Sequence, residues 1–278
     1  MGNTRGSEWR RWDLHVHTPE SGMANGFSDW DSYVIALFNK ALENKIAAIG
    51  ITDYFTIDGY KKLKEEYLNN KGKMLELFKE ETTIEQIKQI KLFPNIEFRL
   101  DIPVVKEKET ARINYHVIFS DEISIKNIEE NFLHEIYLVI ENIPNDKSNK
   151  RKLTKSNIED LGEKIKKEQP DFKGSHFNVG CSVAMVNDAQ IMEILLSHKD
   201  IFEGKYVIVI PVDEDLSKID WKSQGHMTRK ILYQEANMFF SSNPKTRDFG
   251  LGKKSDSIEA FISEFKSLKP CIHGSDAH

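Results

Sequence analysis

The feature that most constrains the fold is a regular alternation of short β-rich segments with amphipathic helical segments. Apolar residues recur at helical spacing in residues 28–45, where Ser28 is a candidate N-cap, and in 125–142, 184–199 and 256–268. Strands that alternate with helices are typical of a parallel α/β sheet, and we expect these to close into a barrel. The β-rich runs cover residues 12–18, 46–54, 91–100, 113–120, 206–213, 236–243 and 269–276.

Length and composition are consistent with one such barrel. The chain has 278 residues, close to the roughly 250 residues of a typical α/β barrel, so we expect a single domain over residues 1–278. Its net charge of −5 provides no general attraction to nucleic acid or to anionic membranes. Cys181 and Cys271 form no CxxC motif, and no apolar run is long enough for a signal peptide or a membrane span. We therefore expect an intracellular, cytoplasmic protein without a membrane partner.

Polar residues lie at or just beyond the ends of the predicted strands, where α/β barrels carry their active sites. In the stretch DLHVHT, alternation places Asp13, His15 and His17 on one face of the strand, so two imidazoles can share one metal ion. A single histidine on a strand is more often an ordinary core residue, but the shared position of the whole set favours a metal site. The set comprises His15, His17, Asp53, Glu97, His116, Asp276 and His278.

Five stretches resemble the successive motifs of the polymerase and histidinol phosphatase (PHP) family. They are DLHVHT, ITDYFTIDGY, PNIEF, HVIF and the closing GSDAH. Within that family, NPKTRDFGLGK and KPCIHGSDAH are most similar to the N-terminal PHP domain of TrlF-like, ATPase-linked proteins. The resemblance implies a distorted seven-stranded parallel (β/α)7 barrel, two or three divalent zinc, manganese or iron ions, and hydrolysis of phosphate esters.

The resemblance also implies a role for each matching residue. It makes His15, His17 and His116 metal ligands, Glu97 a bridging carboxylate, and Asp276 and His278 the closing pair, while Asp53 matches the second motif.

The chain departs from the family pattern at two places. Tyr54 replaces a usual histidine, and a phenol with a pKa of about 10 is a poor ligand at neutral pH. We expect Tyr54 to face the substrate or to lie behind the ligands. Gly22 and Met23 stand where another ligand is often found, with Glu20 as the nearby carboxylate. The remaining family histidine is His176, His226 or neither, and His273 is either a supporting or a core residue.

Other segments carry weaker indications. Lys245 and Arg247 follow the sixth predicted strand and are candidates for orienting a phosphate, or parts of a solvated loop. The basic run 145–155 either contacts a nucleic-acid backbone or is a solvated loop. The acidic run 213–215 either supplements the site or is an ordinary loop. No glycine-rich nucleotide-binding motif is present, so an ATPase would lie outside these residues.

These observations predict a metal-dependent phosphoesterase, specifically a nuclease or nucleotide phosphohydrolase that acts on nucleic acid or nucleotides. The resemblance adds an ATPase domain or partner protein, and we expect the 278 residues to be the N-terminal part of a longer protein. The alternative is a catalytically degenerate PHP module with a binding or regulatory role. Tyr54 favours this alternative, whereas His15, His17, Asp276 and His278 favour the enzyme.

Overall fold

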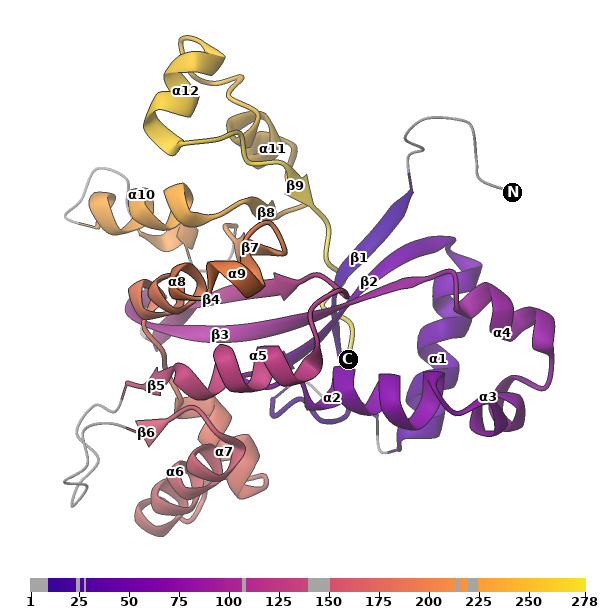
Figure 1. Cartoon of the computed structure of the whole chain (residues 1–278). Coiled ribbons are helices and arrows are strands. Elements are labelled where there is room, and N and C mark those ends of the chain that lie inside the picture. Colours follow the sequence, from indigo (N-terminus) through magenta and orange to yellow (C-terminus); the bar gives the residue numbers. More distant parts are fainter. Residues whose placement is uncertain are drawn as a thin grey trace.

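A computed structural model describes residues 10–23, 26–27, 29–106, 109–139, 151–213, 216–219 and 225–278. Among them, seven strands form one sheet in the order β1-β2-β3-β4-β7-β8-β9 (Figure 1). All seven predicted strands are therefore present. Their bounds are β1 Arg11–His17, β2 Ile46–Tyr54, β3 Lys91–Lys106, β4 Glu109–Phe119, β7 Tyr206–Pro211, β8 Met238–Phe240 and β9 Cys271–Ile272.

The strand directions are mixed, and the prediction of an all-parallel sheet is wrong at β4. Strands β1, β2 and β3 are parallel, as are β7, β8 and β9, but β4 runs antiparallel to both β3 and β7. The reason is the length of the connection. Only residues 107 and 108 separate β3 from β4, whereas a parallel return requires a crossover of about a dozen residues.

The two ends of the sheet meet, which makes the domain barrel-like. The backbone N–H of His17 donates to the carbonyl oxygen of Ala277 at 2.8 Å, and Val16 and Ala277 form a parallel bridge. The N–H of Ser275 donates to Oδ1 of Asp13 at 3.0 Å. Figure 1 shows the C-terminal segment running from β9 past β1 to the end of the chain. This nearly closed sheet brings the first and last predicted motifs together.

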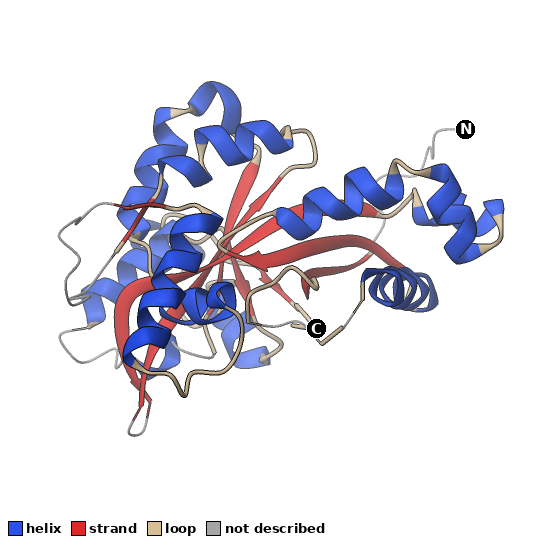
Figure 2. Ribbon diagram, turned by 90° about the horizontal axis from the view of Figure 1, so that it is seen from below, coloured by secondary structure: helices blue, strands red, loops and turns tan. Residues whose placement is uncertain are grey.

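Helices surround the strands on the outside of the barrel, as Figure 2 shows. No helix in the described part of the chain is both long and apolar enough to cross a membrane. Short turns of other helical types cover Leu63–Leu68, Leu133–Glu135 and Leu216–Lys218, and β5 Tyr137–Leu138 pairs with β6 Arg151–Lys152. The α-helices are α1 Trp30–Glu43, α2 Asp58–Lys62, α3 Lys71–Phe78, α4 Glu81–Ile87, α5 Ile125–Asn131, α6 Lys155–Glu168, α7 His176–Val183, α8 Asp188–Ser197, α9 Lys199–Phe202, α10 His226–Glu235, α11 Pro244–Gly250 and α12 Ile258–Phe265.

Two helix predictions need correction. The N-cap of α1 is Asp29, whose carboxylate accepts from the N–H of Ser32 at 2.8 Å, and Ser28 lies outside the described residues. The helix predicted over 125–142 ends at Asn131, because Phe132 leaves the helical conformation with φ −133° and ψ −71°. The chain continues through a 3-10 turn into β5, which pairs with β6.

A small apolar cluster forms the floor of the site. Its side chains come from five strands and converge inside the barrel, apart from the larger core. The ring of Phe240 closes this cluster at the top and stacks on His15 with ring centroids 5.3 Å apart. The cluster comprises Leu14, Ala48, Ile118, Val209 and Phe240.

Candidate metal centre

Five of the predicted ligand residues come together above the apolar floor. His15 and His17 lie on β1, Glu97 on β3, His116 on β4, and Asp276 follows β9. The first four are buried, and Asp276 is exposed at the mouth of the barrel. Residues far apart in the chain therefore present imidazole and carboxylate groups to one small volume.

The Nε2 atoms of His15 and His17 and Oε2 of Glu97 are spaced as ligands of one metal ion are, and Asp276 lies near both nitrogens. Nε2 of His15 lies 3.2 Å from Nε2 of His17, and these nitrogens lie 3.0 and 3.1 Å from Oε2 of Glu97. Oδ1 of Asp276 lies 3.4 Å from each of the two imidazole nitrogens. Ligands about 2.0–2.1 Å from a tetrahedral ion are about 3.3 Å apart. The spacing within the two histidines and Glu97 is therefore compatible with a shared divalent metal ion.

A second group shares His15 and Glu97 and adds His116. Nε2 of His116 lies 3.9 Å from Oε1 of Glu97, and both atoms are buried without a hydrogen-bond partner within the described residues. His15, Glu97 and His116 present ligand atoms within 4.8 Å of one another, as do His15, His17 and Asp276. The two groups overlap at His15, whose neutral imidazole has one lone pair and so ligates one ion.

Asn95 determines which nitrogen of His116 carries the proton. The Asn95 amide nitrogen donates to the carbonyl of Leu14 at 2.8 Å and to Oγ1 of Thr52 at 2.9 Å. Its Oδ1 must then accept from Nδ1 of His116, 3.2 Å away. Nε2 of His116 therefore presents a lone pair to Glu97. Two buried acceptors that face each other are stabilised by a cation between them.

The charge states of the cluster match this interpretation. Burial opposes ionisation of Glu97, but the surrounding imidazoles hold its pKa well below the usual range. Burial lowers the pKa of His116 to about 3, so its imidazole is neutral at pH 7. Burial also disfavours the charged form of His17, but hydrogen bonds to Asp276 and Glu97 raise its pKa to about 9. Without a metal, a proton on His17 offsets part of the negative charge of the two carboxylates.

A β-bulge shapes the start of the site. The register between β1 and β2 shifts between Asp13 and Val16. Simple alternation over residues 13–17 therefore fails at Asp13, whose Oδ1 accepts from the N–H of Ser275 and which joins neither ligand group of the described residues. The bulge lets both histidines reach the same point. Leu14, between Asp13 and His15, packs in the small apolar cluster beneath them.

Tyr54 lies behind His17. Their rings stack with centroids 5.1 Å apart at 20°, and Nδ1 of His17 lies 2.9 Å from Oγ of Ser21. Burial and the charge of Glu97 raise the pKa of Tyr54 above its usual value, so the phenol remains protonated. Because its ring stacks on that of His17, Tyr54 is placed to orient His17. The next residue, Phe55, has φ 63°, a left-handed conformation that costs a bulky residue about 1–3 kcal/mol.

Asp53 lies outside the cluster and has a structural environment. Its carboxylate accepts from the hydroxyl of Thr18 at 2.6 Å and from the N–H of Gly59 at 2.7 Å. A Cβ at Gly59 would lie 2.1 Å from Oγ1 of Thr18, so glycine is required for this contact. Burial raises the pKa of Asp53 to about 7. These bonds join the loop after β1 to the start of α2.

The other candidate residues lie elsewhere in the described structure. Glu20 accepts from Trp30 and Lys62, each at 3.2 Å. His278 is exposed, with its ring centroid 6.5 Å from that of His17. Their roles as ligands remain predictions, as do those of His176 at the start of α7, His226 at the start of α10, and the exposed His273 after β9.

The two cations predicted to orient a phosphate lie on α11. Lys245 lines a cavity of about 340 Å³ with Asp213 and Arg229, and no contact joins Lys245 or Arg247 to the cluster in the described part of the chain. Residues 145–150, Glu214 and Asp215 lie outside the described residues.

Sequence reasoning missed Arg99. It lies two residues after Glu97 on β3, and its guanidinium carbon is 5.9 Å from the centroid of the Tyr54 ring. Successive side chains of a strand point to opposite faces, so Glu97 and Arg99 share one. The stretch IEFRL carries this signal, since Glu97 and Arg99 are two residues apart in it.

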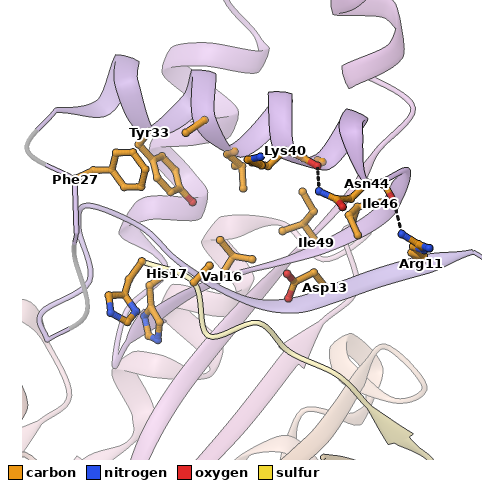
Figure 3. Close-up of a pocket in the computed structure, with 15 residues that line it drawn as sticks. Arg11, Asp13, Val16, His17, Phe27, Tyr33, Lys40, Asn44, Ile46 and Ile49 are labelled. Atoms are coloured by element: carbon orange, nitrogen blue, oxygen red, sulfur yellow. Dashed lines mark hydrogen bonds between the residues drawn. The ribbon is translucent and has the colours of Figure 1, made fainter. Parts of the chain in front are cut away.

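A cavity of about 410 Å³ adjoins the centre between α1 and β1. Figure 3 shows His17 and Phe27 toward one end and Arg11 and Asn44 toward the other. Its walls are largely apolar, including Val16 and the buried Tyr33. The metal centre therefore has an open volume beside it.

Comparisons with known proteins found little similarity in sequence. No family model matches the chain, and no curated protein matches it. Among solved structures, one that covers 97% of this chain and 88% of its own has 12% sequence identity and a TM-score of 0.41. It is the "putative metal-dependent phosphoesterase" from Bifidobacterium adolescentis.

Proposed function

We propose that this chain is a metal-dependent phosphoesterase of PHP type. The observation that supports this most strongly is the pair of buried acceptors, Oε1 of Glu97 and Nε2 of His116, which face each other beside His15, His17 and Asp276. An apolar core would exclude such a pair unless a cation compensated it.

Five residues would hold the metal. The candidate ligands are His15, His17, Glu97, His116 and Asp276, and Glu97 can bridge two ions through its two carboxylate oxygens. Mixed imidazole and carboxylate donors suit zinc, manganese or iron(II). When bound, such ions activate water and polarise a phosphoryl group.

The protein residues around the cluster orient and shield it. Ser21 and Tyr54 fix the ring of His17, Asn95 fixes that of His116, and Phe240 covers the floor beneath His15. Asp276 is exposed at the mouth and is the carboxylate that an entering phosphate ester meets first. The cavity between α1 and β1 provides space for the organic part of the substrate.

The substrate class and the partner are proposed from the sequence motifs. We propose a nuclease or nucleotide phosphohydrolase that works with an ATPase region or partner protein, because NPKTRDFGLGK and KPCIHGSDAH resemble TrlF-like proteins.

A second candidate function is a non-catalytic module. It is favoured by Tyr54, which packs on His17 where the family pattern has another imidazole, and by the exposed position of His278. Such a module would hold metal substoichiometrically.

The test combines metal analysis with a substrate panel. The metal-loaded protein is assayed with single-stranded and double-stranded DNA, RNA, nucleotides and a small aryl phosphodiester, with and without ATP. We expect hydrolysis of at least one ester, and loss of both metal and hydrolysis in His116→Ala and Glu97→Gln. Glu235→Gln is a matched control, since Glu235 is a partly buried carboxylate that accepts from Tyr115 away from the cluster. Stoichiometric metal without hydrolysis of any ester would contradict the proposed function.

A further inference from the structure

Arg99 is a partly buried cation without an anionic partner. Nε of Arg99 is buried and has no hydrogen-bond partner within the described residues, and Nη1 makes one long contact of 3.4 Å to the carbonyl of Ser182. No carboxylate of the described chain lies within ion-pair distance of it. By contrast, Arg112 donates to the carbonyl of Asp101 at 2.8 Å, and Arg229 donates from Nε and Nη2 to the hydroxyl of Tyr233 at 3.0 and 2.8 Å.

The position of Arg99 directs its charge toward the centre. Arg99 and Glu97 point to the same face of β3, and the guanidinium lies over Tyr54, whose ring stacks on His17. A contiguous series of side chains therefore joins Arg99 to the cluster. The Ser182 carbonyl at the end of α7 restrains the guanidinium from the other side.

We propose that Arg99 binds the phosphoryl group of the substrate beside the metal centre. The inference rests on the proposed function and adds to it the residue that positions the phosphate. A guanidinium presents parallel N–H donors that match two oxygens of a phosphate, and an unpaired cation in a partly buried position gains most from such a partner. Arg99 thus takes the role that the sequence suggested for Lys245 and Arg247.

The experiment measures binding of inorganic phosphate to metal-loaded protein by calorimetry, with metal content determined on the same samples. The variants are Arg99→Ala, Arg99→Lys and the control Arg112→Ala, which removes an arginine from the adjacent strand β4. We expect Arg99→Ala to keep its metal and to bind phosphate about 10- to 100-fold more weakly, the effect of losing charge-assisted hydrogen bonds. Arg99→Lys, which keeps the charge but loses the fork, should fall between it and the wild type. Arg112→Ala should bind phosphate as the wild type does.

Phosphate binding separates this inference from the proposed function. If wild type binds phosphate through Arg99 but hydrolyses no ester, the inference stands and the proposed function fails. Wild-type phosphate affinity in a metal-loaded Arg99→Ala protein would overturn the inference, as would absence of phosphate binding by the wild type. Loss of metal from Arg99→Ala would also overturn it, because Arg99 would then support the ligands. If Arg99→Ala does not fold, Arg99→Lys decides by the same criteria.

Discussion

Oε1 of Glu97 and Nε2 of His116 face each other at 3.9 Å inside the barrel, and neither has a hydrogen-bond partner in the described structure. The two residues lie opposite each other on the antiparallel strands β3 and β4. Because Asn95 holds the proton on Nδ1 of His116, both facing atoms are acceptors. Two facing acceptors favour a cation between them, and this is more specific evidence for a metal than the number of histidines.

Asn95 should control metal affinity without being a ligand. Asn95→Ala frees the ring of His116, and we expect metal affinity to fall about 10- to 100-fold, the usual effect of losing a group that orients a ligand. Competition with a chromophoric chelator measures this. Thr52→Val is the control, because it removes the other side-chain partner of Asn95 and leaves the Asn95–His116 bond intact. Equal losses of affinity in both variants would mean that packing, not orientation of His116, is responsible.

Tyr54 should support His17 through its ring and not through its hydroxyl. Tyr54→Phe preserves the stacked ring, so metal content should remain as in the wild type. Tyr54→Ala removes the ring and should weaken metal binding about tenfold, because His17 loses the group that fixes its plane. Metal analysis of both variants checks this. Loss of a full equivalent of metal from Tyr54→Phe would instead identify the phenol as a ligand.

Lys269 should make stability depend on pH in the alkaline range. Its side chain is buried, donates to the carbonyl of Ala236 at 2.6 Å, and has its pKa lowered to about 8 by burial. Between this value and the unfolded value of 10.5, the unfolded chain binds more protons, so this group makes stability rise with pH. Below pH 8 the full cost of burying the ammonium is present.

The variant Lys269→Met isolates this contribution. Urea unfolding at several pH values between 7 and 10.5 should show a smaller increase of stability with pH in the variant than in the wild type. Identical pH dependence in the two proteins would show that Lys269 keeps its ordinary pKa when folded.

The sequence was sufficient to locate the strands because their apolar runs are bounded by polar residues. The strands carry His15, Glu97 and His116, which the fold brings together and whose roles as ligands remain predictions. It did not reveal the direction of β4, which follows from the two-residue connection after Lys106. The predicted strands end at residue 100 and begin again at residue 113, so the predicted connection is long enough for a parallel return. The bulge that turns Asp13 away from His15 depends on pairing with β2, which no single strand encodes.

Asp53 and Arg99 show a different limit. Asp53 is a charged residue near the end of a strand, and Arg99 lies on the same strand face as Glu97. Charged residues in such positions can be metal ligands or purely structural, so the local sequence does not distinguish the two. The two residues differ in their partners, and the role of Asp53 as a ligand remains a prediction. Asp53 has both carboxylate oxygens occupied by Thr18 and Gly59, whereas Arg99 lacks an anion. Such partners are distant in sequence and become adjacent only when the barrel closes.

The most direct test of the account is the metal content of the purified, folded protein. After loading with zinc, manganese or iron(II) and removal of free ions, elemental analysis should find at least one full equivalent of metal per chain. Glu97→Gln should lose its metal, because Oε2 of Glu97 lies 3.0 and 3.1 Å from the Nε2 atoms of His15 and His17, and Oε1 faces His116. A chelator should lower the melting temperature of the wild type. A folded wild-type protein that retains substoichiometric metal under these conditions would contradict the metal centre.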